Sequence, residues 1–103
     1  MKEPVLDEGT VTAALQAEDG LQWHLMGGKL VKSVVCEGFG GAMAFVGAVA
    51  ELAERADHHP DIDIRYNRVT LALITHDSGG ITRLDLDLAR AIDGVTKGLP
   101  PER

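Results

Sequence analysis

Three of the four histidines in this chain lie close together in the sequence, at His58, His59 and His76. Imidazole is the side chain whose unperturbed pKa lies nearest neutral pH, so it can give or take a proton there. The same stretch holds carboxylates that can orient or repolarise an imidazole, namely Glu54, Asp57 and Asp85. Such a cluster in a small protein indicates proton-transfer chemistry or a metal site.

Each carboxylate also has a purely structural interpretation. Glu54 precedes His58 by four residues, so the two share a face of a helix and can form a surface pair at its end. Asp57 can be a solvated residue at the same helix end. Thr82 and Asp85 have the spacing of a shortened capping box.

His76 is expected to end a strand, where a lone histidine can be a hydrogen-bonded core residue. Asp85 offers a functional alternative, because it could accept a hydrogen bond from His76 and fix the tautomer of the ring. His24, on an earlier strand, is predicted to be a surface histidine, and Tyr66 is predicted to pack in the core or at a sheet edge.

A metal site is the competing interpretation, because three histidines can hold a zinc ion and leave one position open. The helical zinc motif, however, places two histidines one turn apart on one face, and the adjacent His58 and His59 lack that spacing. The sequence therefore favours proton transfer over metal chemistry.

Composition limits the classes of function. The chain has 103 residues, which predicts one domain, with an N-terminal arm over residues 1–9 and a tail over 98–103. The net charge of −6 and the lack of a basic stripe argue against a nucleic-acid partner. The longest apolar run, near 42–50, is too short to span a bilayer, and the start of the chain lacks the apolar core of a signal peptide. A cytoplasmic protein is therefore expected, with the single Cys36 buried.

The apolar pattern predicts the elements that must position the histidines. A first helix is expected over 11–18, capped by Thr10 or Thr12. A second helix is expected over 42–57 and is ended by Pro60, and a third begins after Thr82. The expected strands begin with alternation at Leu21, continue across a Gly27–Gly28 turn into 30–36, and resume over 62–66 and 69–76.

Two helices are expected to turn an apolar face toward the core. The middle helix should bury Phe45, Val49, Leu52 and Ala56. The last helix should bury Leu84, Leu88, Ala91, Ile92 and Val95. The order α-β-β-α-β-β-α then predicts an α+β fold, a four-stranded antiparallel sheet with three helices packed on one face.

The spacing of the polar residues resembles the signature of a known family, the pterin-4a-carbinolamine dehydratases, also called 4a-hydroxytetrahydrobiopterin dehydratases. Every position of that signature is occupied: Glu54-x3-His58-His59-Pro60-x5-Tyr66-x9-His76-x8-Asp85. The likeness covers about residues 6–95 and includes Trp23. Val34 and Cys36 stand where the family usually has two phenylalanines, and Gly40 and Gly41 stand at a helix start that is commonly polar.

The resemblance implies a hydro-lyase that removes water from a 4a-hydroxytetrahydropterin to give the quinonoid dihydropterin, with no metal and no organic cofactor. It assigns catalysis to His58, His59 and His76, and substrate binding or orientation to Glu54, Asp57 and Asp85. It also implies a homodimer or homotetramer, in pterin recycling that serves an aromatic amino acid hydroxylase.

The same resemblance leaves a second function open, because family members can act as non-enzymatic dimerisation or assembly partners. Chains that keep only the scaffold can lose the histidines, whereas this chain keeps all three. The histidines therefore favour the enzyme.

Overall fold

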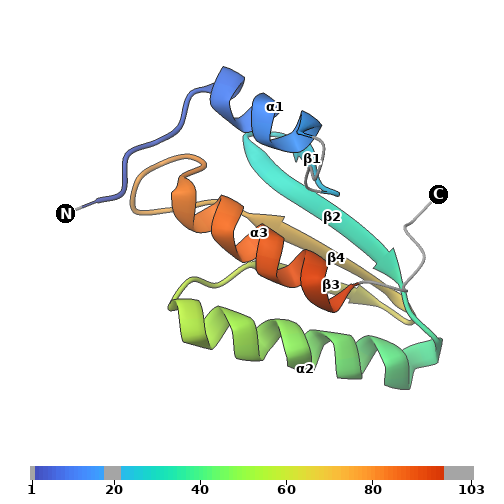
Figure 1. Ribbon diagram of the computed structural model, residues 1–103. Coiled ribbons are helices and arrows are strands. Elements are labelled where there is room, and N and C mark those ends of the chain that lie inside the picture. Colours follow the sequence, from blue (N-terminus) through green and yellow to red (C-terminus); the bar gives the residue numbers. More distant parts are fainter. Residues whose placement is uncertain (1, 18–21, 97–103) are drawn as a thin grey trace.

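The computed structural model describes residues 2–17 and 22–96 and contains three helices and four strands (Figure 1). In chain order they are α1 (Glu8–Gln16), β1 (His24–Met26), β2 (Lys29–Val35), α2 (Gly38–Ala56), β3 (Asp61–Arg65), β4 (Arg68–Leu73) and α3 (Arg83–Val95). This order confirms the predicted α+β architecture. The predicted C-terminal tail, the last residue of the first helix and Leu21 lie outside the described residues.

The four strands form one antiparallel sheet in the order β1-β2-β4-β3. Gly27 and Gly28 join β1 to β2 with φ values of 58° and 77°, the left-handed conformation that a tight two-residue hairpin turn requires. β3 and β4 form the second hairpin. Tyr66 lies in that turn with φ 54° and is 68% exposed, so its predicted place in strand or core packing is wrong.

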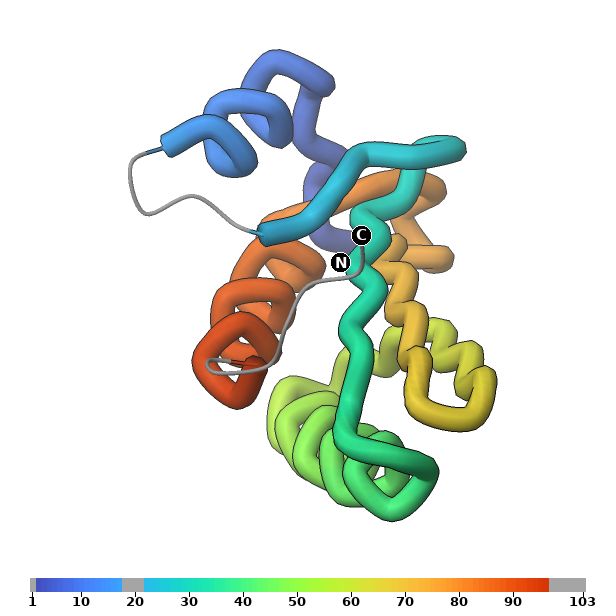
Figure 2. The backbone as a smooth tube through the Cα atoms, turned by 90° about the vertical axis from the view of Figure 1, so that its right-hand side faces the viewer, coloured from blue at the N-terminus to red at the C-terminus, as the bar shows by residue number. Residues whose placement is uncertain are grey.

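The helices cover one face of the sheet (Figure 2). α2 and α3 pack against each other, and α2 also contacts β4. The core between the layers is formed by Leu30, Val34, Ala42, Phe45, Val49, Val69, Leu71, Leu73, Leu88, Ala89 and Ile92. Cys36 joins this core, as predicted, and burial raises the pKa of its thiol.

The ends of α1 and α2 differ from the predicted ones. Asp7, rather than a threonine, caps α1 by accepting a hydrogen bond from the backbone N–H of Thr10 at 2.7 Å, so the helix starts within the predicted arm. α2 begins at Gly38, where φ is 68°, four residues before the predicted Ala42. Glycine tolerates this left-handed entry, which is why a glycine-rich stretch can open a helix here.

The buried faces of α2 and α3 also need correction. Ala56 is exposed, and the buried face of α2 runs through Ala42, Phe45, Val49 and Ala53. On α3, Ala91 and Val95 are exposed, whereas Leu86 and Ala89 are buried. No helix within the described ranges is long and apolar enough to cross a membrane.

Candidate functional site

The candidate site lies where three chain segments meet at one end of the molecule: the end of α2, the turn after β4 and the start of α3 (Figure 1). The end of α2 is made by Asp57, whose φ of 49° is left-handed. The N–H of Asp57 donates to the carbonyl of Glu54, and that of His58 donates to the carbonyl of Ala53. These two bonds form a Schellman motif, which ends the helix and directs His58 toward α3.

Asp85 lies at the centre of the site and is fully buried, at 0% exposure. Its Oδ1 lies 2.5 Å from Nε2 of His58. Its Oδ2 accepts hydrogen bonds from the Thr75 hydroxyl at 2.8 Å and from the N–H of Thr82 at 2.9 Å. One carboxylate therefore joins the residue after the end of α2, the turn that follows β4, and the first turn of α3.

The bond from the N–H of Thr82 to Asp85 is one half of the predicted capping box. In the other half, the Thr82 hydroxyl accepts a hydrogen bond from a backbone N–H in the first turn of α3, so the capping box is confirmed. Thr75 and Thr82 also share a hydrogen bond between their hydroxyls at 2.7 Å. Both threonines are buried. Sequence reasoning missed Thr75, although its position directly before His76 placed it near the cluster.

The functional alternative for Asp85, a hydrogen bond from His76, is not formed, because the imidazole that reaches this buried carboxylate is that of His58. β4 ends at Leu73, and Thr75 forms an isolated bridge with Gly80, so His76 lies in the turn between them rather than in a strand. Its side chain is exposed. The chain turns here because the Thr75 carbonyl accepts from the N–H groups of Ser78, Gly79 and Gly80.

Glu54 pairs with His59 and not, as its spacing predicted, with His58. Its Oε2 lies 2.5 Å from Nε2 of His59, and both side chains are well exposed. The Schellman motif explains the change, because the left-handed Asp57 breaks the helical spacing before either histidine is reached.

Both histidine–carboxylate pairs constrain the imidazole tautomer. An ionised carboxylate can only accept, so the proton in each bond resides on Nε2 of the histidine. Nδ1 of His58 and of His59 is then the nitrogen that remains to take a proton from a ligand, or to give one when the ring is charged. The arrangement suits general acid–base chemistry.

The fourth histidine lies away from this network. His24 lies on β1 and is exposed, as predicted. Within the described part of the chain, no group of three or more His, Cys, Asp or Glu side chains is placed to hold a metal ion.

Comparison with known proteins identifies the family. A family model described as pterin 4 alpha carbinolamine dehydratase matches residues 4–95. The chain belongs to the pterin-4-alpha-carbinolamine dehydratase family. A relative from Thermomicrobium roseum, which carries this name provisionally, is 54% identical over 87 residues, covering 84% of this chain and 91% of the relative. A second provisionally named relative, from Nocardia farcinica, is 45% identical over 97 residues, covering 94% of this chain and the whole relative.

Two solved structures share the fold of this pterin-4-alpha-carbinolamine dehydratase family member. A transcriptional coactivator/pterin dehydratase from Brucella melitensis superposes with a TM-score of 0.80 at 34% identity, covering 88% of this chain and 97% of that one. A pterin dehydratase-like RuBisCO assembly factor of the alpha-carboxysome has a TM-score of 0.58 at 20% identity, covering 76% and 90%. The second likeness shows the fold alone.

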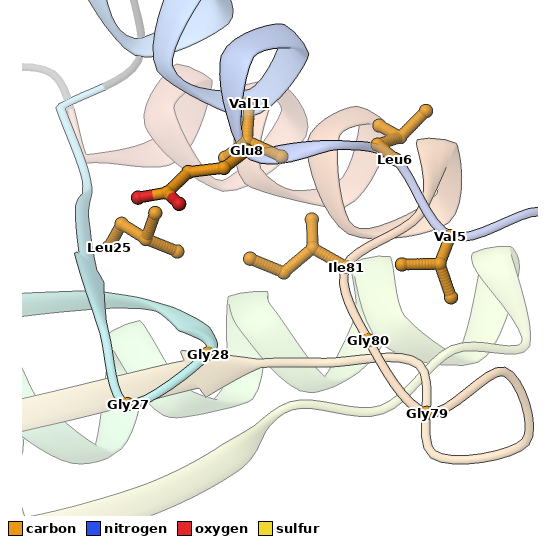
Figure 3. Close-up of a pocket in the computed structure, with 10 residues that line it drawn as sticks. All are labelled: Val5, Leu6, Glu8, Val11, Leu25, Gly27, Gly28, Gly79, Gly80 and Ile81. Carbon is orange, nitrogen blue, oxygen red and sulfur yellow. The ribbon is translucent and has the colours of Figure 1, made fainter.

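A pocket of about 480 Å³ lies next to the turn that carries His76 in this dehydratase-family chain (Figure 3). Its lining comes from the N-terminal arm, α1, the β1–β2 hairpin and the turn: Val5, Leu6, Glu8, Val11, Leu25, Gly27, Gly28, Gly79, Gly80 and Ile81. None of the three clustered histidines lines it. The pocket and the histidine cluster thus share the turn between Thr75 and Gly80 but are different places.

Proposed function

We propose that this protein is a hydro-lyase that converts 4a-hydroxytetrahydropterin to quinonoid dihydropterin and water. The observation that carries the proposal is the His58–Asp85 pair, in which a fully buried carboxylate holds a histidine at 2.5 Å in a chain of the pterin-4-alpha-carbinolamine dehydratase family. A carboxylate buried at this depth is costly unless it is fully hydrogen-bonded. Its position beside a proton-transfer group supports a chemical role.

The reaction needs one acid and one base. The C4a–O bond breaks, its electron pair leaves with the oxygen, and a proton from an acid turns the leaving group into water. The base removes the proton from N5, and a double bond forms between N5 and C4a. Each correctly placed group contributes a factor of roughly 10² to 10⁴ in rate.

In this proposal His58 and His76 carry the two proton transfers on opposite sides of the pterin, and His59 binds the ring or shares the acid role. Asp85 orients His58, and Glu54 orients His59, as their hydrogen bonds support. Asp57 hydrogen-bonds the amide edge of the pterin. The remaining elements of the proposal are a cytoplasmic homodimer or homotetramer, without a metal or an organic cofactor, in the recycling of the pterin for an aromatic amino acid hydroxylase.

Single-turnover dehydration of freshly generated 4a-hydroxytetrahydropterin tests the proposal. His58→Ala and His76→Ala should each slow the reaction at least about tenfold. His24→Ala is the matched control, because His24 is an exposed histidine on β1, and it should react at the wild-type rate. Wild-type rates in both site variants would remove these histidines from the mechanism, and loss of activity with a chelator would favour a metal instead.

A non-enzymatic assembly role on the same scaffold is the second candidate. It is favoured by β3, an edge strand in which all five residues are exposed. An open edge can pair with a strand of another chain. A His58→Ala/His76→Ala double variant separates the two functions, since it should lose dehydration and keep any assembly measured by sedimentation.

A further inference from the structure

The N-terminal arm before α1 lies against the turn that carries His76. The Leu6 N–H donates to the carbonyl of Ile81 at 2.8 Å. The Ser78 hydroxyl donates to the backbone carbonyl of Glu3 at 2.6 Å. Contacts from the arm therefore reach both the turn itself and the residue that follows it.

A third contact joins the side chain of Glu3, in the arm, to the start of α3. Nη2 of Arg83 donates to Oε1 of Glu3 at 2.6 Å, and this carboxylate raises the pKa of the Arg83 guanidinium. Arg83 also pairs with Asp87 on its own helix at 3.3 Å. The arm and α3 thus share one guanidinium.

The arm also packs closely on the turn. A Cβ atom built on Gly80 would lie only 2.8 Å from Cγ1 of Val5, so a side chain at that position would collide with the arm. Figure 3 shows Val5 beside Gly80, and Val5, Leu6 and Gly80 all line the pocket. The arm and the turn therefore form neighbouring parts of the pocket wall.

We propose that the arm, residues 3–6, is a positioning element that holds the turn of residues 75–80, and with it His76, in place for proton transfer. This inference rests on the proposed dehydratase function. Three backbone N–H groups of the turn donate to the Thr75 carbonyl and shape the turn, and the Thr75 hydroxyl ties the start of the turn to Thr82 and Asp85. The arm supplies the attachment at the other end of the turn, where Ser78 donates to the Glu3 carbonyl, Val5 lies against Gly80, and Leu6 donates to the carbonyl of the next residue, Ile81.

The test is a double variant, Glu3→Gln/Ser78→Ala, which removes the charge of the Arg83 pair and the hydroxyl that binds the arm. We expect kcat to fall about tenfold with KM nearly unchanged, because small displacements of a catalytic group lower the rate without weakening binding. Amide exchange at Gly79 and Gly80 should become faster. Asp87→Asn is the matched control, since it removes one charge opposite the same Arg83 guanidinium without touching the arm, and it should leave both readouts unchanged.

A second comparison separates positioning from general stability. On a His76→Ala background the double variant should cause no further loss of kcat, because residues that act through one group are not additive. An unchanged kcat in the double variant, or the same tenfold loss on the His76→Ala background, would overturn the inference. If the wild-type protein does not dehydrate the pterin, the proposed function fails, and amide exchange still decides whether the arm holds the turn: faster exchange supports this, and unchanged exchange overturns it.

Discussion

The two histidine–carboxylate pairs have the same 2.5 Å separation and very different surroundings. In the His58–Asp85 pair the side chains are 11% and 0% exposed, whereas in the His59–Glu54 pair they are 57% and 76% exposed. A buried carboxylate that loses a partner leaves unsatisfied groups, while an exposed pair is screened by water and contributes little. Asp85 should therefore matter for both stability and chemistry, and Glu54 mainly for chemistry.

Asp85→Asn should lower the free energy of unfolding by about 1–3 kcal/mol, because an amide cannot accept from His58, Thr75 and Thr82 as a carboxylate does. It should also slow single-turnover dehydration about tenfold or more, because Nε2 of His58 loses the acceptor that fixes its proton. Urea denaturation measures the first effect, and rapid mixing with the substrate measures the second.

Glu54→Gln is the control for this prediction, with an expected stability change below about 0.5 kcal/mol. Nitrogen NMR of the His58 ring would report its tautomer directly. An Asp85→Asn protein with wild-type stability, wild-type rate and an unchanged His58 tautomer would contradict the role assigned to this carboxylate.

At the level of helices and strands, local patterns predicted most of the fold. The alternation around Gly27–Gly28 predicted the first hairpin, and the Thr82–Asp85 spacing predicted the capping box that starts α3. These features depend on neighbours in the sequence. The start of α1 was missed because both Asp7 and Thr10 are good capping residues, and only the backbone decides which one accepts the bond.

The contacts of the site could not be predicted in the same way. His58 and Asp85 are separated by 27 residues, and no local pattern shows that they meet. His76 was placed in a strand because its alternation continues that of β4, but the Thr75–Gly80 bridge bends the chain first. The pairing of Glu54 with His59 depends on the left-handed φ of Asp57. An aspartate tolerates this conformation, but the residue type alone does not predict it.

The α1 cap makes a prediction about pH. Hydrogen bonds from Thr10, chiefly from its backbone N–H, lower the pKa of Asp7 below 3.8. A carboxyl group whose pKa is lower in the folded state stabilises the fold at pH values above its pKa in the unfolded state. This contribution is lost as the pH falls through its pKa in the folded state. Asp7→Asn keeps a capping side chain without the charge. The wild-type protein should therefore have a higher Tm than the variant at pH 6, and the difference should shrink below about pH 4.

Thermal unfolding followed by circular dichroism over this pH range measures the effect. Glu8→Gln is a suitable control, because it removes an acid from the first turn of α1 without touching the cap. A difference between wild type and Asp7→Asn that stays constant from pH 6 to below pH 4 would contradict the assignment.

For the molecule as a whole, α3 carries the candidate site at its start and closes the fold near its end. Oδ1 of Asp93 accepts from Nε1 of Trp23 at 2.8 Å and from Nζ of Lys32 at 2.9 Å, and Oδ2 accepts from the N–H of Gln22 at 3.1 Å. This links α3 to β2 and to the segment before β1. Asp93 is eight residues after Asp85, about 12 Å along the helix, so the two carboxylates can be tested separately.

Asp93→Ala should lower the free energy of unfolding by about 2–3 kcal/mol, because the nearly buried ammonium of Lys32 loses its charged partner and keeps only the Gln22 carbonyl, and the indole N–H of Trp23 loses its acceptor. Lys32→Met should cost less, about 1 kcal/mol, since Asp93 keeps two donors and methionine can fill the space of the lysine stem.

Urea denaturation measures both changes. The folded fraction of each variant should dehydrate the pterin at the wild-type rate, because the network lies at the other end of α3 from His58. Equal losses of stability in the two variants would show that Asp93 contributes only through Lys32, and a lower rate in either would show that closure of the fold also shapes the site.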